Sequence, residues 1–404
     1  MRIRRRSLLL QGALIMLLAF MDPFASFRSA LGRSTVKVGL LVDLSGKTRE
    51  KGNAVRRVSE MAVDRVNAQG GVSGRLVELI PWDTAGNPIV GKNGAKVLTS
   101  DREVTAVVGP ADWATAMMTK PFFEETQTPV MMLTWEDSVI RGGKFGMYEW
   151  IFRLPLRRRT ALERIGTFLK NKGWTRVGLV ITSDGIGREA REWFEHESPD
   201  YGVEEVIVKS FILTEDVAGK LRMLVDQKPQ VIVSWCPATY AVTVARILRE
   251  MTTDLPLFQC HEISPRKYVE MAGPDAKKTL FVSNKILVWE ELEETDPQKE
   301  MIQDFVHQYR DVYGYGSREP VSPFMGYVWD SIMILVRSMR AGGTDRIWLQ
   351  HVIESTQRHV GIGGVYGFNH EDHNGLDPDS TVIVEVDRVY GDGRRWVGSW
   401  RLVN

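Results

Sequence analysis

Apolar and polar positions alternate along the chain in blocks that predict strands and helices in turn. Residues 36–42 are a continuous apolar run, which is typical of a strand buried on both faces. Between residues 54 and 66, apolar side chains recur every three or four positions, which predicts a helix that ends at the glycine turn 69–71. Residues 76–81 predict a second strand. These segments together indicate one β-α-β unit of a parallel sheet.

The same alternation continues to the C-terminus and indicates two similar lobes. We expect each lobe to be a parallel sheet with helices on both faces, which places the chain in the α/β class. Pro155 disfavours helix at the residue before it, so the run 147–153 should end in a first crossing between the lobes, and the run 280–288 should be a return crossing. The expected helices are 89–100, 113–126, 158–172, 186–197, 217–227, 240–251, 297–313 and 323–339, and the remaining strands are 104–108, 130–133, 177–182, 206–211, 231–234 and 257–259.

The N-terminus has the charged-then-apolar pattern of an export signal. Four arginines within the first six residues precede the mostly apolar run 7–20, which is too short to span a bilayer comfortably. Arg5-Arg6 has the twin-arginine arrangement, which would mean export in the folded state, while the general secretory route remains open. We expect cleavage at Ser29-Ala30, with an uncleaved anchor as the alternative.

Composition and charge exclude some classes of partner. The chain has 404 residues, is 43% hydrophobic and carries a formal charge of +1, so it is long enough for two lobes and gives no sign of a nucleic-acid partner. Cys236 and Cys260 follow two strands of the second lobe. They could form a disulfide in an oxidising compartment, but two buried thiols are the favoured interpretation.

Three motifs resemble cofactor or metal sites without meeting their requirements. Residues 46–48 resemble the end of a phosphate-binding loop, but Leu41 stands where the first glycine is needed. Residues 185–190 resemble a dinucleotide fingerprint, but the next strand does not end in an acid. Residues 370–373, with their neighbouring turn signals, favour a solvated hairpin over a metal site. We therefore expect no cofactor, no metal and no catalytic constellation, and predict that the protein is not an enzyme.

Tryptophans at strand ends are the candidate ligand-binding residues. Trp113, Trp135 and Trp235 each follow a predicted strand, and the carboxyl ends of parallel strands meet at one edge of a sheet. A single tryptophan is more often packed in a core or on a surface. Three at equivalent positions favour a cleft for a small molecule, because an indole offers a large apolar area and one donor.

Three connecting segments carry a resemblance to a known family. They are residues 43–46 (DLSG), 67–74 (NAQGGVSG) and 83–88 (DTAGNP). In these segments the chain resembles the periplasmic solute-binding proteins of the branched-chain amino-acid transporter type, the receptor subunits of ABC importers. The resemblance extends over nearly all of the chain after the leader. It implies two lobes joined by three crossings, the third near 361–368, and a hinge that closes on the ligand.

The resemblance also implies domain boundaries and partners. We expect an export signal and leader at 1–33, a first lobe from 34–154 plus 289–365, and a second lobe from 155–288 plus 366–404. The implied function is a periplasmic receptor, acting as a monomer, that delivers a small molecule to an ABC permease and ATPase complex. A periplasmic sensor that presents its closed form to a signalling partner is the alternative.

Position by position, the sequence departs from the amino-acid binders of this family. Trp113, next to Thr115, stands where the family has a carboxylate-binding serine, and Ile186 replaces a tyrosine of the second lobe. Glu262 matches the acid that receives the ligand ammonium. The other implied contacts are Thr134, Trp135 and Glu136 after the fourth strand, and Phe324 at the start of a helix beside the cleft. With Glu136 in place of a carboxylate-binding hydroxyl, we expect an amino-acid-like, cationic or aromatic ligand.

Overall fold

The computed structural model describes residues 35–101, 103–143, 146–211, 216–251, 255–317, 319–391 and 396–403. The predicted export signal at 1–33, with Arg5-Arg6 and the expected cleavage site, lies outside the described residues. Within the described ranges, every helix falls short of the length and apolarity needed to cross a membrane.

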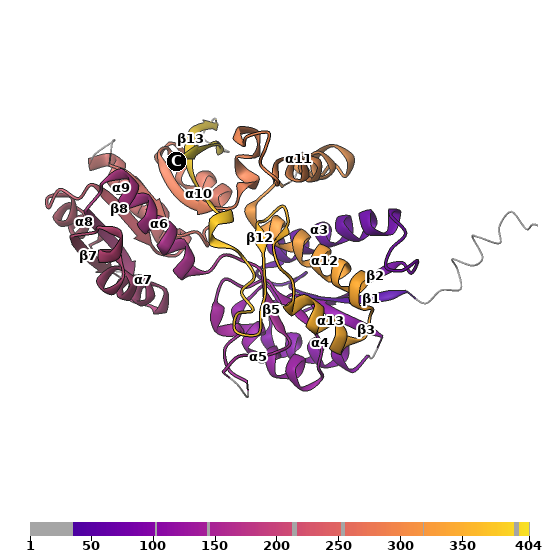
Figure 1. The fold of residues 1–404 in the computed structure, drawn as a ribbon. Coiled ribbons are helices and arrows are strands. Elements are labelled where there is room, and N and C mark those ends of the chain that lie inside the picture. Colours follow the sequence, from indigo (N-terminus) through magenta and orange to yellow (C-terminus); the bar gives the residue numbers. More distant parts are fainter. Residues whose placement is uncertain are drawn as a thin grey trace, which may run out of the picture.

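The first sheet is parallel throughout and has the order β2-β1-β3-β4-β5. Its two faces are covered by different helices, α3 with α12 on one and α4 with α5 on the other (Figure 1). The strands are β1 (Val36–Val42), β2 (Val77–Asp83), β3 (Val104–Val108), β4 (Val130–Met132) and β5 (Ile151–Arg153), and the helices are α3 (Arg49–Ala68), α4 (Pro88–Ser100), α5 (Trp113–Glu125) and α12 (Pro323–Gly342).

Helix α3 begins immediately beside the end of β1. A Cβ atom on Gly52 would fall 1.7 Å from the carbonyl oxygen of Asp43, so only glycine allows the first turn to pack this closely. The Asp43 carboxylate holds the connecting loop by accepting hydrogen bonds from the backbone N–H groups of Gly46 (2.6 Å) and Thr48 (2.7 Å). The first turn of α3 is thereby fixed at the carboxyl edge of the sheet.

The second sheet has seven strands in the order β14-β13-β10-β9-β8-β6-β7. Its strands β6 to β10 are parallel, and the C-terminal pair β13 and β14 adds an antiparallel edge. The strands are β6 (Arg176–Thr182), β7 (Glu205–Phe211), β8 (Val231–Trp235), β9 (Leu257–Gln259), β10 (Thr279–Ser283), β13 (Val382–Gly391) and β14 (Trp396–Val403), and the helices are α6 (Arg158–Lys172), α7 (Gly185–His196), α8 (Val217–Val225), α9 (Ala238–Met251) and α10 (Pro265–Ala272).

The segment after β10 returns to the first sheet. Helix α12 packs on α3, and α13 (Arg346–Glu354) packs on α12, while α11 (Lys299–His307) lies near α3 through an ion pair between Asp304 and Arg65 (Figure 1). A short hairpin, β11 (His359–Val360) and β12 (Val365–Tyr366), then leads to β13 in the second sheet. The exact lobe boundaries at 154, 288 and 365 stay predictions.

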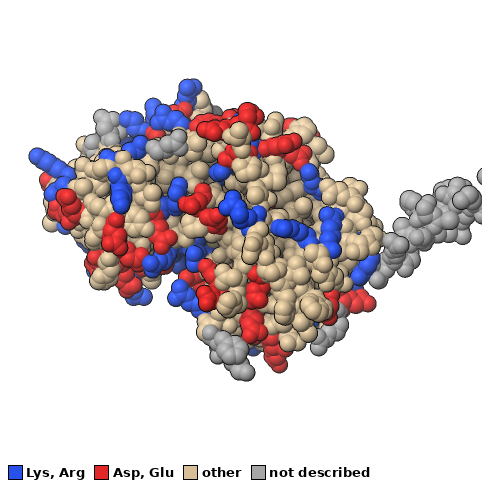
Figure 2. All heavy atoms as spheres, viewed as in Figure 1, with Lys and Arg blue, Asp and Glu red and all other residues tan. Residues whose placement is uncertain are grey.

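The predicted fold class is confirmed, two local predictions are corrected, and one helix was missed. The run 280–288 is not one extended crossing, because its first part is β10 of the second sheet and residues 285–287 form a 3₁₀ turn. Helix α3 starts at Arg49 instead of residue 54, and α13 was not predicted. Figure 2 shows basic and acidic side chains intermixed over the face in view, as the near-zero net charge leads one to expect.

Candidate functional site

A cavity of about 870 Å³ lies between the two sheets at the carboxyl ends of their strands. Open α/β sheets bind ligands at the point where the strand order reverses, which is between β1 and β3 in the first sheet and between β6 and β8 in the second. The cavity has lining residues from both points, including Lys51 after β1, Ile186 after β6 and Cys236 after β8. Both lobes therefore contribute to one cavity of ligand size.

Trp135 forms the aromatic centre of the cavity. Its ring centroid lies 5.8 Å from that of Phe324, 6.0 Å from that of Tyr327 and 5.5 Å from that of His261. All four side chains line the cavity. Burial lowers the pKa of His261 to about 3, helped by the positive charge of Arg158, so this imidazole is neutral at ordinary pH. These rings offer a ligand an apolar, aromatic wall.

Arg153 fixes the position of Trp135 through hydrogen bonds to the backbone of the loop after β4. It is fully buried at the end of β5 and donates hydrogen bonds to the carbonyl oxygens of Thr134 (3.0 Å), Trp135 (2.7 Å) and Leu156 (3.0 Å), and to the side-chain oxygen of Asn374 (2.8 Å). Burial lowers its pKa to about 10, which leaves it charged. Because these acceptors come from three separate segments, Arg153 ties the loop after β4 to two of the segments between the sheets.

Arg158, the first residue of α6, holds the two acids that the sequence assigned to the ligand. Its guanidinium pairs with Glu262 and lies 3.1 Å from Glu136 and 3.6 Å from Glu189. Burial raises the pKa of Glu262, and Arg158 opposes this rise. Glu136 belongs to the first lobe and Glu262 to the second, so the cluster also bridges the lobes. The expectation that these acids stand free for a cationic ligand therefore does not fit the structure.

Lys51, in the first turn of α3, is a cation of the cavity lining. Its Nζ donates a hydrogen bond to the carbonyl oxygen of Ala111 (2.8 Å) and lies 4.2 Å from the ring centroid of Phe324 and 5.8 Å from that of Trp135. Burial lowers its pKa to about 8, although the charges of nearby acids oppose that shift. This ammonium group thus contacts two rings and a carbonyl oxygen, and no carboxylate of the described residues forms an ion pair with it.

The structure divides the remaining predicted contacts into two groups. Ile186 and Phe324 line the cavity together with Trp135. Thr134 and Thr115 are buried and are not among the described residues that line the cavity, and the hydroxyl of Thr115 has no hydrogen-bond partner within the described part of the chain.

The expectation that three indoles share one rim is corrected by their burial. Trp113, 50% exposed, donates a hydrogen bond to Ser138 Oγ (3.4 Å), and Trp235 is fully buried with its ring 5.6 Å from that of His261. Among the described residues that line the cavity, Trp135 is the single tryptophan. Trp235 belongs to β8 itself, where both faces are covered, so its indole is part of the core.

Sequence reasoning missed Lys51, Arg153 and Arg158. Lys51 precedes the predicted helix, because the apolar periodicity starts only at residue 54, whereas the observed helix α3 begins at Arg49. The position of Arg158 at the start of a predicted helix, directly after a crossing, was the available signal for a residue between the lobes. Which acids it would pair with depends on the tertiary structure.

The other sequence candidates have structural roles. Cys236 and Cys260 are separate buried thiols, and burial raises the pKa of Cys236 to about 12. His373 is buried, with its ring nitrogens 2.9 Å from the Ile151 carbonyl oxygen and 3.2 Å from the Glu354 carboxylate. Asp184 caps α7 through the backbone N–H of Gly187 (3.0 Å). His373 and Asp184 stabilise the fold away from the cavity lining, while the two thiols belong to that lining without being joined to each other.

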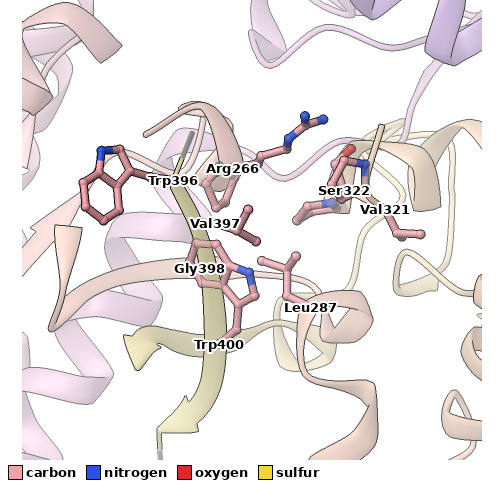
Figure 3. Close-up of a pocket in the computed structure, with 11 residues that line it drawn as sticks. Arg266, Leu287, Val321, Ser322, Trp396, Val397, Gly398 and Trp400 are labelled. Atoms are coloured by element: carbon pink, nitrogen blue, oxygen red, sulfur yellow. The ribbon is translucent and has the colours of Figure 1, made fainter. Parts of the chain in front are cut away.

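A second, smaller cavity lies beside the first, under the edge strand β14. It has a volume of about 60 Å³ and includes Leu287, Trp396 and Trp400 in its lining (Figure 3). A space of this size holds a few water molecules, since one needs about 10–15 Å³. It is too small for the kind of ligand that the larger cavity can hold.

Comparison with known proteins agrees with this architecture. A family model described as periplasmic binding protein matches residues 35–389. The Leu/Ile/Val-binding protein BraC3 of Rhizobium johnstonii is 26% identical over 177 residues, which are 44% of this chain and 47% of that relative, so the match spans about half of its length.

Solved structures share the fold at low sequence identity. An extracellular ligand-binding receptor from Rhodopseudomonas palustris HaA2 has a TM-score of 0.73 and 19% identity, covering 92% of this chain and 100% of that one. The leucine binding protein LivK from Thermotoga maritima MSB8 has a TM-score of 0.69 and 18% identity, covering 92% and 99%. The resemblance inferred from the sequence is confirmed, and the chain belongs to the periplasmic binding protein family.

Proposed function

We propose that this protein is an exported, non-enzymatic receptor of an ABC importer, which binds one small molecule and delivers it to a membrane permease. The observation that carries the proposal is the cavity of about 870 Å³ between the strand ends of two α/β sheets, with lining residues from both. Its lining includes Trp135 and Phe324 of the first lobe and Ile186 and Glu262 of the second. The receptor acts as a monomer in the periplasm.

Closure of the lobes on the ligand is the physical basis of this function. Chain segments that cross between two rigid lobes form a hinge, so a ligand that contacts both lobes favours the closed form. Small-angle scattering with and without a saturating ligand should show a smaller radius of gyration when the ligand is bound. An unchanged radius would argue against a hinged receptor.

Delivery to a permease is tested by a pull-down from membranes. The mature protein, immobilised with its ligand, should retain permease and ATPase subunits from detergent-solubilised membranes of its own organism. Retention of a signalling receptor in their place would support the sensor alternative and overturn delivery.

The export route is tested at Arg5 and Arg6. If they form a twin-arginine signal, replacing both with lysine should leave precursor in the cytoplasm. Normal export of that variant would assign the protein to the general secretory route.

A further inference from the structure

Lys51 stands at the switch point of the first sheet, where the ligand is expected. It belongs to the loop and helix that follow β1, and its hydrogen-bond acceptor Ala111 follows β3. The ammonium group therefore lies between the ends of the two strands at which the order reverses. It lines the cavity beside Trp135 and Phe324.

Lys51 has no ion-pair partner in the part of the chain that the structure describes, although the charges of Glu136, Glu262 and Asp112 act on it from beyond contact distance and partly oppose the lowering of its pKa by burial. Throughout the described ranges its polar contact is the Ala111 carbonyl and its other contacts are the two rings, with no ion pair. Its place in the first turn of α3 adds to the imbalance, because the N-terminal end of a helix carries a partial positive charge. A cation removed from water in this way is stabilised best by an anion that arrives with the ligand.

The surroundings of Lys51 extend the positive potential toward the mouth of the cavity. Lys47 and Arg49 line the cavity, are exposed and, in the part of the chain that the structure describes, have no acidic partner. Glu50, the acid of the same turn, is 2.7 Å from Lys267 of α10. The first-lobe entrance of the cavity is therefore positive, which attracts anions.

On the opposite side, Glu262 is the acid that could receive a ligand ammonium, and it is already paired with Arg158. Arg158 in turn contacts Glu136 and Glu189, so these charges compensate one another. A zwitterionic amino acid would gain a partner for its carboxylate at Lys51 and none for its ammonium. A ligand that carries an anion alone matches the cavity better.

We propose that the ligand is a small carboxylate with an aromatic body and no ammonium group, bound with its carboxylate at Lys51 and its ring against Trp135 and Phe324. This inference rests on the proposed receptor function. The body is assigned from the lining around the ammonium group, where the rings of Trp135, Phe324 and Tyr327 adjoin Leu156 and Ile186. An aromatic ring would stack on or pack edge-on against these side chains.

The test uses three probes of the same shape that differ in charge: benzoate, benzamide and benzamidinium. L-phenylalanine and acetate complete the set, the first adding an ammonium group and the second lacking the ring. Calorimetric titration of the mature protein should give an affinity for benzoate at least tenfold above those for benzamide and acetate. Benzamidinium and L-phenylalanine should bind more weakly than benzoate.

Variants assign the preference to Lys51. Lys51→Gln should lower the affinity for benzoate at least tenfold and bring it to that for benzamide, while Lys51→Arg retains the preference. The matched control Lys96→Gln, which changes an exposed lysine of α4 that lies over the ring of Phe122 and outside the cavity lining, should change the affinity for benzoate by less than threefold. Thermal melting of each variant shows whether it is folded.

Several outcomes would overturn the inference. Tighter binding of benzamide or benzamidinium than of benzoate, or a full preference for benzoate in Lys51→Gln, would exclude the Lys51 carboxylate site. Binding of L-phenylalanine with no binding of benzoate would also exclude it, and would leave the receptor function intact. If no probe binds, the inference fails, and the receptor function fails with it when the membrane pull-down is negative as well.

Discussion

Lys51, in the lining of the cavity, and Arg158, paired with Glu262 beside it, are two cations with opposite electrostatic environments. Although burial alone would lower it, the pKa of Arg158 is raised, because the carboxylates of Glu262, Glu136 and Glu189 surround it. Burial lowers the pKa of Lys51 to about 8, because the charges of Glu136, Glu262 and Asp112 offset only part of the cost of removing its ammonium group from water. The contrast between the ion-paired Arg158 and Lys51 shows that a charge in a cleft is available to a ligand only where the protein leaves it without an ion pair.

The comparison also separates two tasks that a receptor must perform. The Arg158 cluster joins Glu136 of the first lobe to Glu262 of the second, so its ion pairs contribute to how the lobes are held together. Lys51 makes contacts within the first lobe alone and faces the cavity. We therefore expect changes at Arg158 to alter stability most, and changes around Lys51 to alter ligand affinity most.

The largest expected effect is the loss of stability in Arg158→Met. Removing the guanidinium leaves Glu262, which is mostly buried, without its partner, and such an unpaired charge costs about 3–5 kcal/mol. Denaturant unfolding of the variant measures this loss. The neighbouring Arg159→Met is the matched control, because Arg159 is exposed in its pairs with Glu163 and Glu197, and it should cost less than about 1 kcal/mol.

Equal stability of the two arginine variants would contradict the proposed role of Arg158, since it would mean that solvent screens the charges of its cluster.

The Arg158→Met variant also has an expected effect on ligand selectivity. In Arg158→Met the carboxylate of Glu262 becomes free, so the affinity for benzamidinium should rise relative to that for benzoate. A selectivity that stays unchanged would show that Glu262 does not reach the ligand.

The second effect is the loss of affinity for benzoate in Trp135→Ala. The indole contributes apolar area and ring contacts to the ligand, and its removal should cost about 1–3 kcal/mol of binding free energy, measured by calorimetry. Trp113→Ala is the control, because Trp113 is half-exposed and outside the cavity lining among the described residues. A larger loss of benzoate affinity in Trp113→Ala than in Trp135→Ala would support the prediction that Trp113 contacts the ligand.

The third effect is a loss of benzoate affinity at high pH. A bound carboxylate favours the protonated ammonium and so raises the pKa of Lys51 above its value of about 8 in the free protein. Affinity is therefore full below pH 8 and falls as the pH rises through 8, by about tenfold per pH unit. The acids whose charges act on Lys51 are Glu136, Glu262 and Asp112, and each of them favours its protonated form.

Titrations between pH 6.5 and 9.5 measure this profile, and Lys51→Arg is the matched control. Its guanidinium stays charged throughout, so its affinity should not change with pH. A parent profile that is as flat as that of Lys51→Arg would show that Lys51 does not titrate next to the ligand.

The fold could be predicted from the sequence because it depends on local patterns. Apolar runs such as residues 36–42 and 231–234 mark buried parallel strands, and β9 was placed at its observed bounds. Where tertiary contacts override the local pattern, prediction was less complete. The start of α3 at Arg49 depends on its packing against Asp43, which no periodicity records.

The site could be predicted only in part, because burial and pairing are tertiary properties. Trp135 follows from its position after a strand, whereas Ile186 and Phe324 were implied by the family resemblance, and all three line the cavity. Trp235 has the same kind of position and is buried in the core. Glu136 and Glu262 were recognised as acids near the ligand, but their partner Arg158 is distant in the sequence from both.

The smallest expected effect is that of Glu262→Gln on benzoate binding. It decides whether Glu262 binds a ligand ammonium or serves only as a partner of Arg158. If Glu262 served a ligand ammonium, its neutralisation would cost about 2–5 kcal/mol of binding free energy. In the structure its carboxylate is occupied by Arg158, which keeps Glu136 and Glu189 as partners when Glu262 is changed. The ligand carboxylate would then meet one negative charge fewer. We expect the affinity for benzoate to stay within threefold of the parent value or to increase slightly. Calorimetry of Glu262→Gln and of Lys51→Gln tests this directly. A loss of benzoate affinity in Glu262→Gln as large as in Lys51→Gln would show that Glu262 contacts the ligand.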